Sequence, residues 1–418
     1  MVRCPVASVN RPLRIALLSY RSKPHSGGQG VYVRQLSREL AAAGHHVEVF
    51  SGQPYPELDD GPLLRRVPSL DLYRDDDPFR TPKRAEIRDW TDALETAMMW
   101  GGAFPEPLTF SIRALRALRE RAGDFDVVHD NQGLGYGMLG VRRLGVPLVT
   151  SIHHPITVDK RLDLADRSWL ERLNKSRWYC FTRMQGRVAR RVGPLITVSQ
   201  SSKNDICRDF GIKPSNVHIV PLGVDTRLFR PRASPRVPGR IVAVASADSP
   251  LKGLLTLLRA VAKLVTERDV QLIVVGIPSE ATRTQAAQLD LGDKVTFTSG
   301  LPDEEYARLL ASAAIAVIPS RYEGFSLPAV EHMASGTPLI ASRAGALPEV
   351  TGDAALLVNP GDPEDLAAAL RKLLDHDAER ARLAARGLAR VGERFAWPAV
   401  AVATAALYRR AINGEIGC

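Results

Sequence analysis

Several features that would assign the chain to a secreted, membrane-spanning or metal-binding class are missing from the sequence. The four cysteines, Cys4, Cys180, Cys207 and Cys418, are scattered without paired spacing, which argues against a disulfide framework or a structural metal. No apolar run is long enough to cross a bilayer, and residues 1–12 lack the continuous apolar segment of a secretory signal. The simplest expectation is a reduced, cytoplasmic protein.

The chain is too long for one compact core. Its 418 residues suit two domains of roughly 200 residues each. A hydrophobic content of 45% and a charged content of 24% are typical of a globular protein. The formal charge of +10 favours anionic partners. Most of the excess lies in residues 160–191, the basic segment, where ten Lys and Arg stand against three acids.

Both halves predict a parallel sheet with helices on its faces. Apolar runs at 13–19 and 47–50 flank a glycine loop and a periodic helix, a unit of Rossmann type, and further short strands follow up to residue 220. Strand–helix alternation starts afresh at 241 and continues to 358. Residues 52–107 carry no clear pattern and receive no assignment. The predicted division is a first domain at 1–225, a linker at 226–238, a second domain at 239–395 and a C-terminal helix at 396–418 that packs back on the first domain.

Histidines follow two of the predicted strands in the first half. His129 ends one strand, and His153 and His154 follow another. Loops at the carboxyl ends of parallel strands line ligand crevices, and a histidine there can donate to an oxygen or relay a proton. The alternative is a histidine that caps its own loop.

The stretch 320–331 carries the strongest local signal. A buried strand at 314–318 leads into it, Gly324 permits a turn, and Pro328 suits the first turn of a helix. A helix N-terminus that opens out of a strand binds anions through its free amides and dipole. The flanking acids Glu323 and Glu331 are better suited to accept hydrogen bonds from hydroxyls. Phosphate and hydroxyls together suggest a nucleotide sugar, and the alternative is an ordinary turn.

The basic segment allows two interpretations. Its Trp, Phe and Leu residues alternate with arginines, which suits an anionic membrane surface. No recognised nucleic-acid-binding module accompanies it. The alternative is a helical hairpin that buries its aromatic residues against its own domain and leaves the arginines in water.

These motifs together resemble glycosyltransferase family 4, the retaining enzymes of GT-B fold that include sucrose synthases and phosphatidylinositol mannosyltransferases. Residues 323–331 match the E-x(7)-E signature of that family, with Ser326 in place of its second glycine. Further matches, which extend the resemblance over nearly the whole chain, are Gly27-Gly28, Ser151-x-His153, 223–225, 334–341 and 345–349.

The resemblance implies a role for each matched position. Glu323 would bind hydroxyls of the donor sugar, Glu331 the ribose, and Lys252 the pyrophosphate. Gly28 would let the backbone approach the pyrophosphate closely, and His153 would touch the sugar and align the acceptor. The expected donor-binding set is Gly27, Gly28, Ser246, Lys252, Gly324, Phe325, Ser326, Leu327 and Glu331, with His153 and Glu323 catalytic and His129 and His154 on the acceptor side.

One position departs from the family pattern. The family carries an arginine six residues before the lysine, and this chain has Ser246 there. Loss of one of two cations should weaken stabilisation of the departing nucleoside diphosphate. Arg343 or a metal ion would then have to replace it.

The resemblance implies a retaining transferase that moves a sugar from a UDP- or GDP-linked donor to a hydroxyl acceptor, in the synthesis of a glycan, glycolipid or small glycoside. If the basic segment contacts a membrane, a lipid-linked acceptor is expected. No cofactor and no metal are expected. The alternatives are a nucleotide-sugar epimerase or a phosphorylase of the same fold, or a non-catalytic protein that binds sugar nucleotides.

Overall fold

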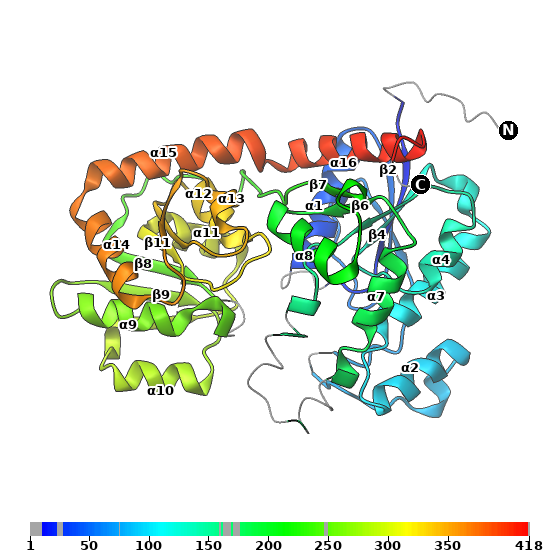
Figure 1. Ribbon diagram of the computed structural model, residues 1–418, viewed down its shortest axis with the longest axis horizontal. Helices are drawn as coiled ribbons and strands as arrows, with labels where there is room; N and C mark the ends of the chain where they lie inside the picture. Colours follow the sequence, from blue (N-terminus) through cyan, green and yellow to red (C-terminus); the bar gives the residue numbers. More distant parts are fainter. Residues whose placement is uncertain are drawn as a thin grey trace. The chain divides into compact units, whose positions relative to one another are not determined.

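The computed structural model describes residues 11–22, 28–74, 76–158, 160–161, 169, 176–245 and 250–416. The chain forms two compact α/β units (Figure 1). The first unit combines residues 1–198, 202–220 and 398–418, and the second combines 199–201 and 221–397. The predicted class, two Rossmann-like domains, is confirmed. The grouping assigns 221–225 to the second unit, whereas the predicted boundary follows residue 225.

The first unit is built on a seven-stranded parallel sheet in the order β3-β2-β1-β4-β5-β6-β7. Its strands are β1 (Arg14–Ser19), β2 (His46–Ser51), β3 (Leu63–Arg66), β4 (Val127–Asn131), β5 (Leu148–Ser151), β6 (Leu195–Thr197) and β7 (Val217–Ile219). Its helices are α1 (Gly28–Ala42), α2 (Trp90–Trp100), α3 (Glu106–Arg119), α4 (Gly137–Arg142), α7 (Phe181–Ala189), α8 (Gln200–Phe210) and α16 (Trp397–Ile412). Short 3-10 turns are η1 (Arg84–Glu86), η2 (Ala122–Asp124) and η3 (Pro214–Asn216).

The second unit has a six-stranded parallel sheet in the order β10-β9-β8-β11-β12-β13. Its strands are β8 (Val237–Val244), β9 (Gln271–Val275), β10 (Val295–Thr298), β11 (Ala313–Ile318), β12 (Leu339–Ser342) and β13 (Ala355–Val358). Its helices are α9 (Leu254–Leu264), α10 (Glu280–Gln288), α11 (Asp303–Ser312), α12 (Leu327–Ala334), α13 (Leu347–Thr351), α14 (Pro363–Asp375) and α15 (Asp377–Arg394). Two 3-10 turns are η4 (Pro250–Lys252) and η5 (Gly292–Lys294). Strand β8 begins inside the predicted linker.

Helix α16 packs against the first unit, as the sequence predicted for the C-terminal helix. In Figure 1 the red α16 runs beside the blue β2 and α1. The hydroxyl of Tyr408 lies 2.6 Å from Nδ1 of His129 on β4, and both residues are fully buried. Residues that are distant in sequence thus complete one core.

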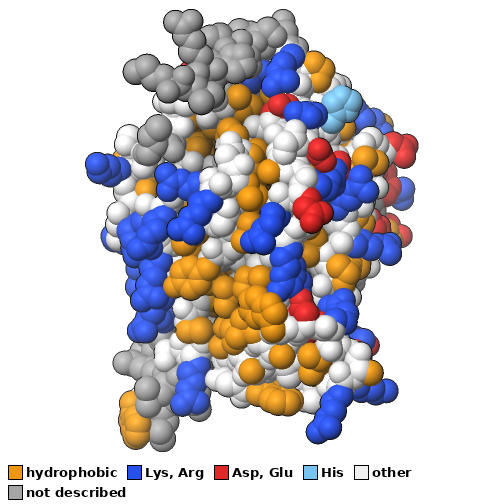
Figure 2. Space-filling model, turned by 90° about the vertical axis from the view of Figure 1, so that its right-hand side faces the viewer, with side chains coloured by type: hydrophobic (Ala, Val, Ile, Leu, Met, Phe, Trp, Pro, Cys, Tyr) orange, Lys and Arg blue, Asp and Glu red, His pale blue; other side chains and the backbone are white. Residues whose placement is uncertain are grey.

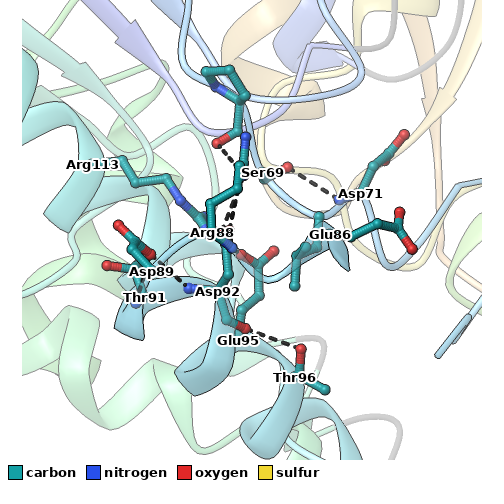
Figure 3. Close-up of polar contacts among 12 residues, drawn as sticks. Ser69, Asp71, Glu86, Arg88, Asp89, Thr91, Asp92, Glu95, Thr96 and Arg113 are labelled. Carbon is teal, nitrogen blue, oxygen red and sulfur yellow. Dashed lines mark hydrogen bonds and ion pairs between the residues drawn. The ribbon is translucent and has the colours of Figure 1, made fainter. Parts of the chain in front are cut away.

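Helix α2 was not predicted, because it buries polar side chains and exposes apolar ones, the reverse of the burial pattern of an ordinary surface helix. Its buried side chains include Thr91, Asp92 and Glu95, whereas Trp90 and Trp100 are 60% and 68% exposed. Figure 2 shows hydrophobic side chains gathered on the face of the first unit that lies on the right in Figure 1, with Lys and Arg side chains around them. Helices normally bury their apolar side. The buried acids of α2 are instead held by arginines (Figure 3).

Part of the basic segment lies outside the described residues, namely 162–168 and 170–175. In the described part, the ring of Trp178 packs 5.0 Å from Phe104 and 5.5 Å from Tyr73, measured between ring centroids. Helix α7 buries Phe181 and exposes Arg183. Trp178 and Phe181 therefore follow the second interpretation, in which the aromatic residues pack on their own unit, whereas Trp169 is 69% exposed. Among the described residues, no helix has both the length and the apolar character needed to cross a membrane.

Candidate active site

Each sheet has one point where the strand order reverses. In the second unit β9 and β10 lie on one side of β8, and β11, β12 and β13 lie on the other. In the first unit the reversal falls between β1 and β4. Open parallel sheets bind ligands beyond the carboxyl ends of the strands at such a point. Lys252 and Glu323 follow β8 and β11, and Gly28 and Asn131 lie after or at the ends of β1 and β4.

The carboxylate of Glu323 is held by two donors. Its Oε1 accepts from Nζ of Lys252 and from Oγ of Ser320, both at 2.8 Å. Glu323 is 9% exposed and Ser320 is 2% exposed, so this pair is largely shielded from water. The arrangement fixes one oxygen of the carboxylate. The predicted cation and the predicted catalytic acid therefore meet in one unit.

Gly253 explains how Lys252 reaches this position. Its φ is +67°, and a Cβ there would lie 2.0 Å from the carbonyl oxygen of Pro319. The amide of Arg321 donates to the carbonyl of Leu251 at 2.7 Å, which joins the two loops. Only glycine combines this left-handed backbone with so close an approach. The lysine is therefore placed by the residue that follows it.

A third loop, after β12, supports Glu323 from its backbone side. The amide of Ala346 donates to the carbonyl of Glu323 at 2.8 Å. Gly345 has φ +53°, and a Cβ there would lie 2.3 Å from the same carbonyl oxygen. Loops from three neighbouring strands, β8, β11 and β12, thus converge on one side chain.

Ser326 is the strained residue of the stretch. It precedes α12 with φ 83° in the left-handed region, where the family signature has glycine. It is 6% exposed, and its hydroxyl has no hydrogen-bond partner among the described residues. Gly324 is half-buried, Phe325 packs against Phe395 with ring centroids 5.7 Å apart, and Leu327 begins α12. A serine therefore adopts the left-handed backbone conformation at the end of this turn.

Glu331 has a partner that sequence reasoning missed. The hydroxyl of Tyr306 on α11 donates to its Oε2 at 2.7 Å. Burial raises the pKa of Glu331 to about 7, although the Tyr306 hydrogen bond opposes this shift. The ring of Tyr306 packs against Phe229, with centroids 5.7 Å apart. The carboxylate is thus aimed by an aromatic residue and changes its charge near neutral pH.

His153 is the predicted residue best placed for contact in the first unit. Its Nε2 lies 2.7 Å from Oδ1 of Asn131, and its amide donates to Oε1 of Gln132 at 3.1 Å. The ring of Tyr32 packs on it edge-on, with centroids 4.4 Å apart. Burial lowers the pKa of His153 to about 4, so the ring is neutral at pH 7. Its Nδ1 has no partner among the described residues.

The other two histidines differ from His153. Both ring nitrogens of His129 are engaged, Nδ1 with Tyr408 and Nε2 with Ser151, each at 2.6 Å, and the side chain is fully buried. Direct contact with an acceptor does not fit this burial, so His129 is better described as part of the core. His154 is half-buried, and its carbonyl accepts from Gln132.

The remaining predicted positions are Gly27, Gly28 and Ser246. Gly28 begins α1, and a Cβ there would have no described atom within 4 Å, which leaves open space for a ligand. Gly27 and Ser246 lie outside the described residues. Among the residues that are described, no group of three or more His, Cys, Asp or Glu is arranged to hold a metal ion.

Other supporting residues were also missed. Gln185 on α7 donates to the carbonyls of Gln132 and Gly133 at 3.3 Å, which ties the loop after β4 to the basic segment. Asn131 and Ser320 orient the two predicted catalytic residues. Ser320 lies inside the stretch 320–331, whereas no spacing rule points to Asn131 or Gln185.

Comparison with known proteins agrees with this architecture. Residues 26–228 match the family described as Glycosyltransferase Family 4, and residues 238–376 match Glycosyl transferases group 1. An MMP alpha-(1->4)-mannosyltransferase from Mycolicibacterium hassiacum is 56% identical over 412 residues, which span 97% of this chain and 100% of that protein. A D-inositol 3-phosphate glycosyltransferase from a Nocardioides species is 32% identical and covers 97% of this chain and 92% of its own.

The fold has a solved counterpart of similar extent. The sucrose-phosphate synthase of Thermosynechococcus elongatus superposes with a TM-score of 0.72 at 26% identity, over 95% of this chain and 98% of that one. Two parallel-sheet units with ligand loops at their switch points define the class: the protein is a glycosyltransferase of GT-B fold. Within that class, the chain belongs to glycosyltransferase family 4.

Proposed function

We propose that the enzyme transfers a mannosyl group from a nucleoside diphosphate mannose, UDP- or GDP-linked, to a sugar hydroxyl with retention of configuration. The observation that carries this proposal is the Lys252–Glu323 pair at the switch point of the second unit, directly before the N-terminus of α12. The mannosyl assignment rests on the relative that is 56% identical and is named an alpha-(1->4)-mannosyltransferase. With an α-linked donor, an α-linked product corresponds to retention.

Donor recognition divides between the two acids. The free amides and the dipole of α12 attract the distal phosphate, and Lys252 adds a full positive charge to it. Oε1 of Glu323 accepts hydrogen bonds from Lys252 and Ser320, and its other oxygen is available to accept hydrogen bonds from sugar hydroxyls. Glu331, aimed by Tyr306, accepts the ribose hydroxyls when it is ionised.

The reaction forms a bond between the acceptor oxygen and the anomeric carbon while the bond from that carbon to the phosphate oxygen breaks on the same face, and the proton of the acceptor hydroxyl passes to the departing diphosphate oxygen. Charge then builds on the departing diphosphate, and fixed donors that face it lower the barrier. His153 is neutral at pH 7, so it orients the acceptor hydroxyl rather than supplying a positive charge.

Arg343 is our candidate for the cation that Ser246 does not supply. It follows β12 directly, in the loop whose Gly345 and Ala346 contact Glu323, and its side chain is exposed. No carboxylate partner of Arg343 occurs among the residues that the structure describes. A guanidinium at this loop can approach the diphosphate without breaking an existing ion pair. Replacement of Arg343 by Gln should therefore lower kcat and leave the melting temperature nearly unchanged.

The test is a transfer assay with a panel of UDP- and GDP-linked sugars and α-linked mannosides as acceptors. We expect one nucleoside diphosphate mannose to support product formation, and the proton coupling of the new anomeric carbon to show the α configuration. Glu323→Gln should abolish transfer without unfolding the protein, and Glu305→Gln, an exposed acid on α11, is the matched control. Nucleotide binding without turnover of any sugar would indicate a non-catalytic binding protein. A β-linked product would refute retention.

Three further expectations from the sequence stay predictions. Transfer should not depend on an added metal, so activity should survive dialysis against a chelator. The protein should fractionate with the cytoplasm. If the basic segment attaches the enzyme to a membrane, co-sedimentation with anionic vesicles should fall as salt rises, because salt screens such contacts.

A further inference from the structure

Four buried polar side chains connect the C-terminal helix of the first unit to the ring that packs on His153. Nδ1 of His129 on β4 lies 2.6 Å from the hydroxyl of Tyr408 on α16, and its Nε2 lies 2.6 Å from Oγ of Ser151 at the end of β5. The side chain of Ser151 is hydrogen-bonded in turn to Tyr32 on α1. All four residues are buried. Tyr408, His129, Ser151 and Tyr32 are called the buried row below.

The phenol of Tyr408 decides which nitrogen of His129 carries the proton. Among the described residues, Nδ1 of His129 is the only hydrogen-bond partner of the Tyr408 hydroxyl, so this O–H donates to Nδ1. Burial is the main cause that lowers the pKa of His129 to about 3, so the ring is neutral at pH 7 and has a single N–H. That N–H is therefore on Nε2. The opposite tautomer would leave the buried phenol O–H without an acceptor, which folded proteins avoid.

The same direction continues along the rest of the buried row. The Nε2–H of His129 donates to Oγ of Ser151. The hydroxyl proton of Ser151 is then left to donate to the oxygen of Tyr32. Each member thus accepts from one neighbour and donates to the next. The direction is set at the end that lies on α16, because the Tyr408 hydroxyl has a single place to donate.

Two contacts define the orientation of the His153 ring. Its Nε2 lies 2.7 Å from Oδ1 of Asn131, and the Tyr32 ring packs on it with centroids 4.4 Å apart and an angle of 68° between the planes. Asn131 holds one atom of the imidazole, about which the ring can still tilt. The Tyr32 ring limits this tilt, and Ser151 holds Tyr32 at its hydroxyl. The buried row therefore supports the plane of the His153 ring.

We propose that Tyr408 is a positioning residue for the transfer reaction. It makes His129 a donor to Ser151, and the buried row then holds the His153 ring in the orientation that meets the acceptor hydroxyl. This inference rests on the proposed role of His153. A group that orients a substrate acts only within a narrow range of positions, so a looser support lowers the rate. Helix α16 therefore contributes to catalysis as well as to the core.

The first test compares Tyr408→Phe with a matched variant of the same helix, Thr404→Val, in the transfer assay and in thermal unfolding. Thr404 is fully buried on α16, and its hydroxyl donates within the helix, to the carbonyl of Val400 at 2.8 Å. We expect Tyr408→Phe to lower kcat/KM for the acceptor about tenfold, because rate falls steeply when an orienting group is displaced. KM for the sugar nucleotide should not change. Thr404→Val should keep wild-type kinetics whatever its melting temperature.

Two kinetic outcomes would overturn the proposal. One is wild-type kinetics in Tyr408→Phe, and the other is an equal loss in Thr404→Val, which would reduce both hydroxyls to structural roles. A double-mutant cycle with Ser151→Ala then tests the route. Because Ser151→Ala already interrupts the buried row, adding Tyr408→Phe should cause little further loss. Independent losses that multiply would show that Tyr408 does not act through the row.

Nitrogen-15 NMR of histidine-labelled protein tests the buried row without any turnover. We expect the wild-type His129 to carry its proton on Nε2, and the ring signals of His153 to shift in Tyr408→Phe but not in Thr404→Val. A proton on Nδ1 of His129, or His153 signals unchanged by Tyr408→Phe, would overturn the inference. If the wild type transfers no sugar, the proposed function fails, and the NMR comparison still decides whether Tyr408 positions His153.

Discussion

Replacement of Ser326 by glycine should stabilise the second unit. A left-handed backbone at a non-glycine residue costs about 1–3 kcal/mol. A buried hydroxyl without a partner costs about 1–3 kcal/mol more. The greater freedom of glycine in the unfolded chain offsets roughly 0.5–1 kcal/mol of this gain in stability. With φ 83° and 6% exposure at this serine, we expect a net gain of about 2 kcal/mol.

The assay is thermal unfolding of the full chain followed by circular dichroism. For a unit of this size, such a gain should raise the transition by about 4–8 °C. Ser326→Ala is the control, because it removes the hydroxyl and keeps the strained backbone, so its gain should be about half as large. A Ser326→Gly protein no more stable than the wild type would refute the reasoning. Nucleoside diphosphate affinity of both variants shows whether the hydroxyl also contributes to binding.

Three other perturbations test the site and its support. Burial raises the pKa of Glu331 to about 7, so its contribution to stability is present at low pH and lost as pH rises through 7. In Glu331→Gln this loss should disappear from pH-dependent melting curves, together with any gain in nucleotide affinity over the same interval. Arg113→Ala leaves the buried Glu95 without its ion-pair partner, while Asp92 keeps Arg88, and should cost about 3–5 kcal/mol in urea unfolding. Gly345→Ala places a Cβ 2.3 Å from the carbonyl oxygen of Glu323 at a residue with φ +53°, so the melting temperature should fall, and transfer should fall sharply in a steady-state assay because Glu323 is displaced.

The sequence predicted the sheets well, because buried parallel strands read as short apolar runs. The run at 13–19 and the predicted strand at 314–318 match β1 and β11 to within one residue at each end. The stretch 52–107 gave no signal, since β3 is only four residues long and largely exposed, and α2 buries acids rather than apolar side chains. Periodicity of apolar residues cannot reveal a helix that is fixed by ion pairs with Arg88 and Arg113.

Candidate site residues could be named from the sequence where they lie in a short continuous motif. Glu323, Lys252 and the start of α12 come from motifs in which glycines and a strand end mark the position. Tyr306, Asn131 and Gln185 could not be found this way, because each acts on a residue 22 to 53 positions away through a geometry set by packing. Their side chains are common types with no characteristic spacing.

The first unit is discontinuous in sequence, and this has a consequence for synthesis. The second unit is contiguous from 221 to 397 apart from residues 199–201, whereas the first unit also needs 398–418. His129 on β4 meets Tyr408, which is 279 positions later in the chain. Domains usually fold in the order in which the ribosome releases them. Here the unit that is translated first can complete its core only after the other unit has already emerged, which reverses the usual order of maturation.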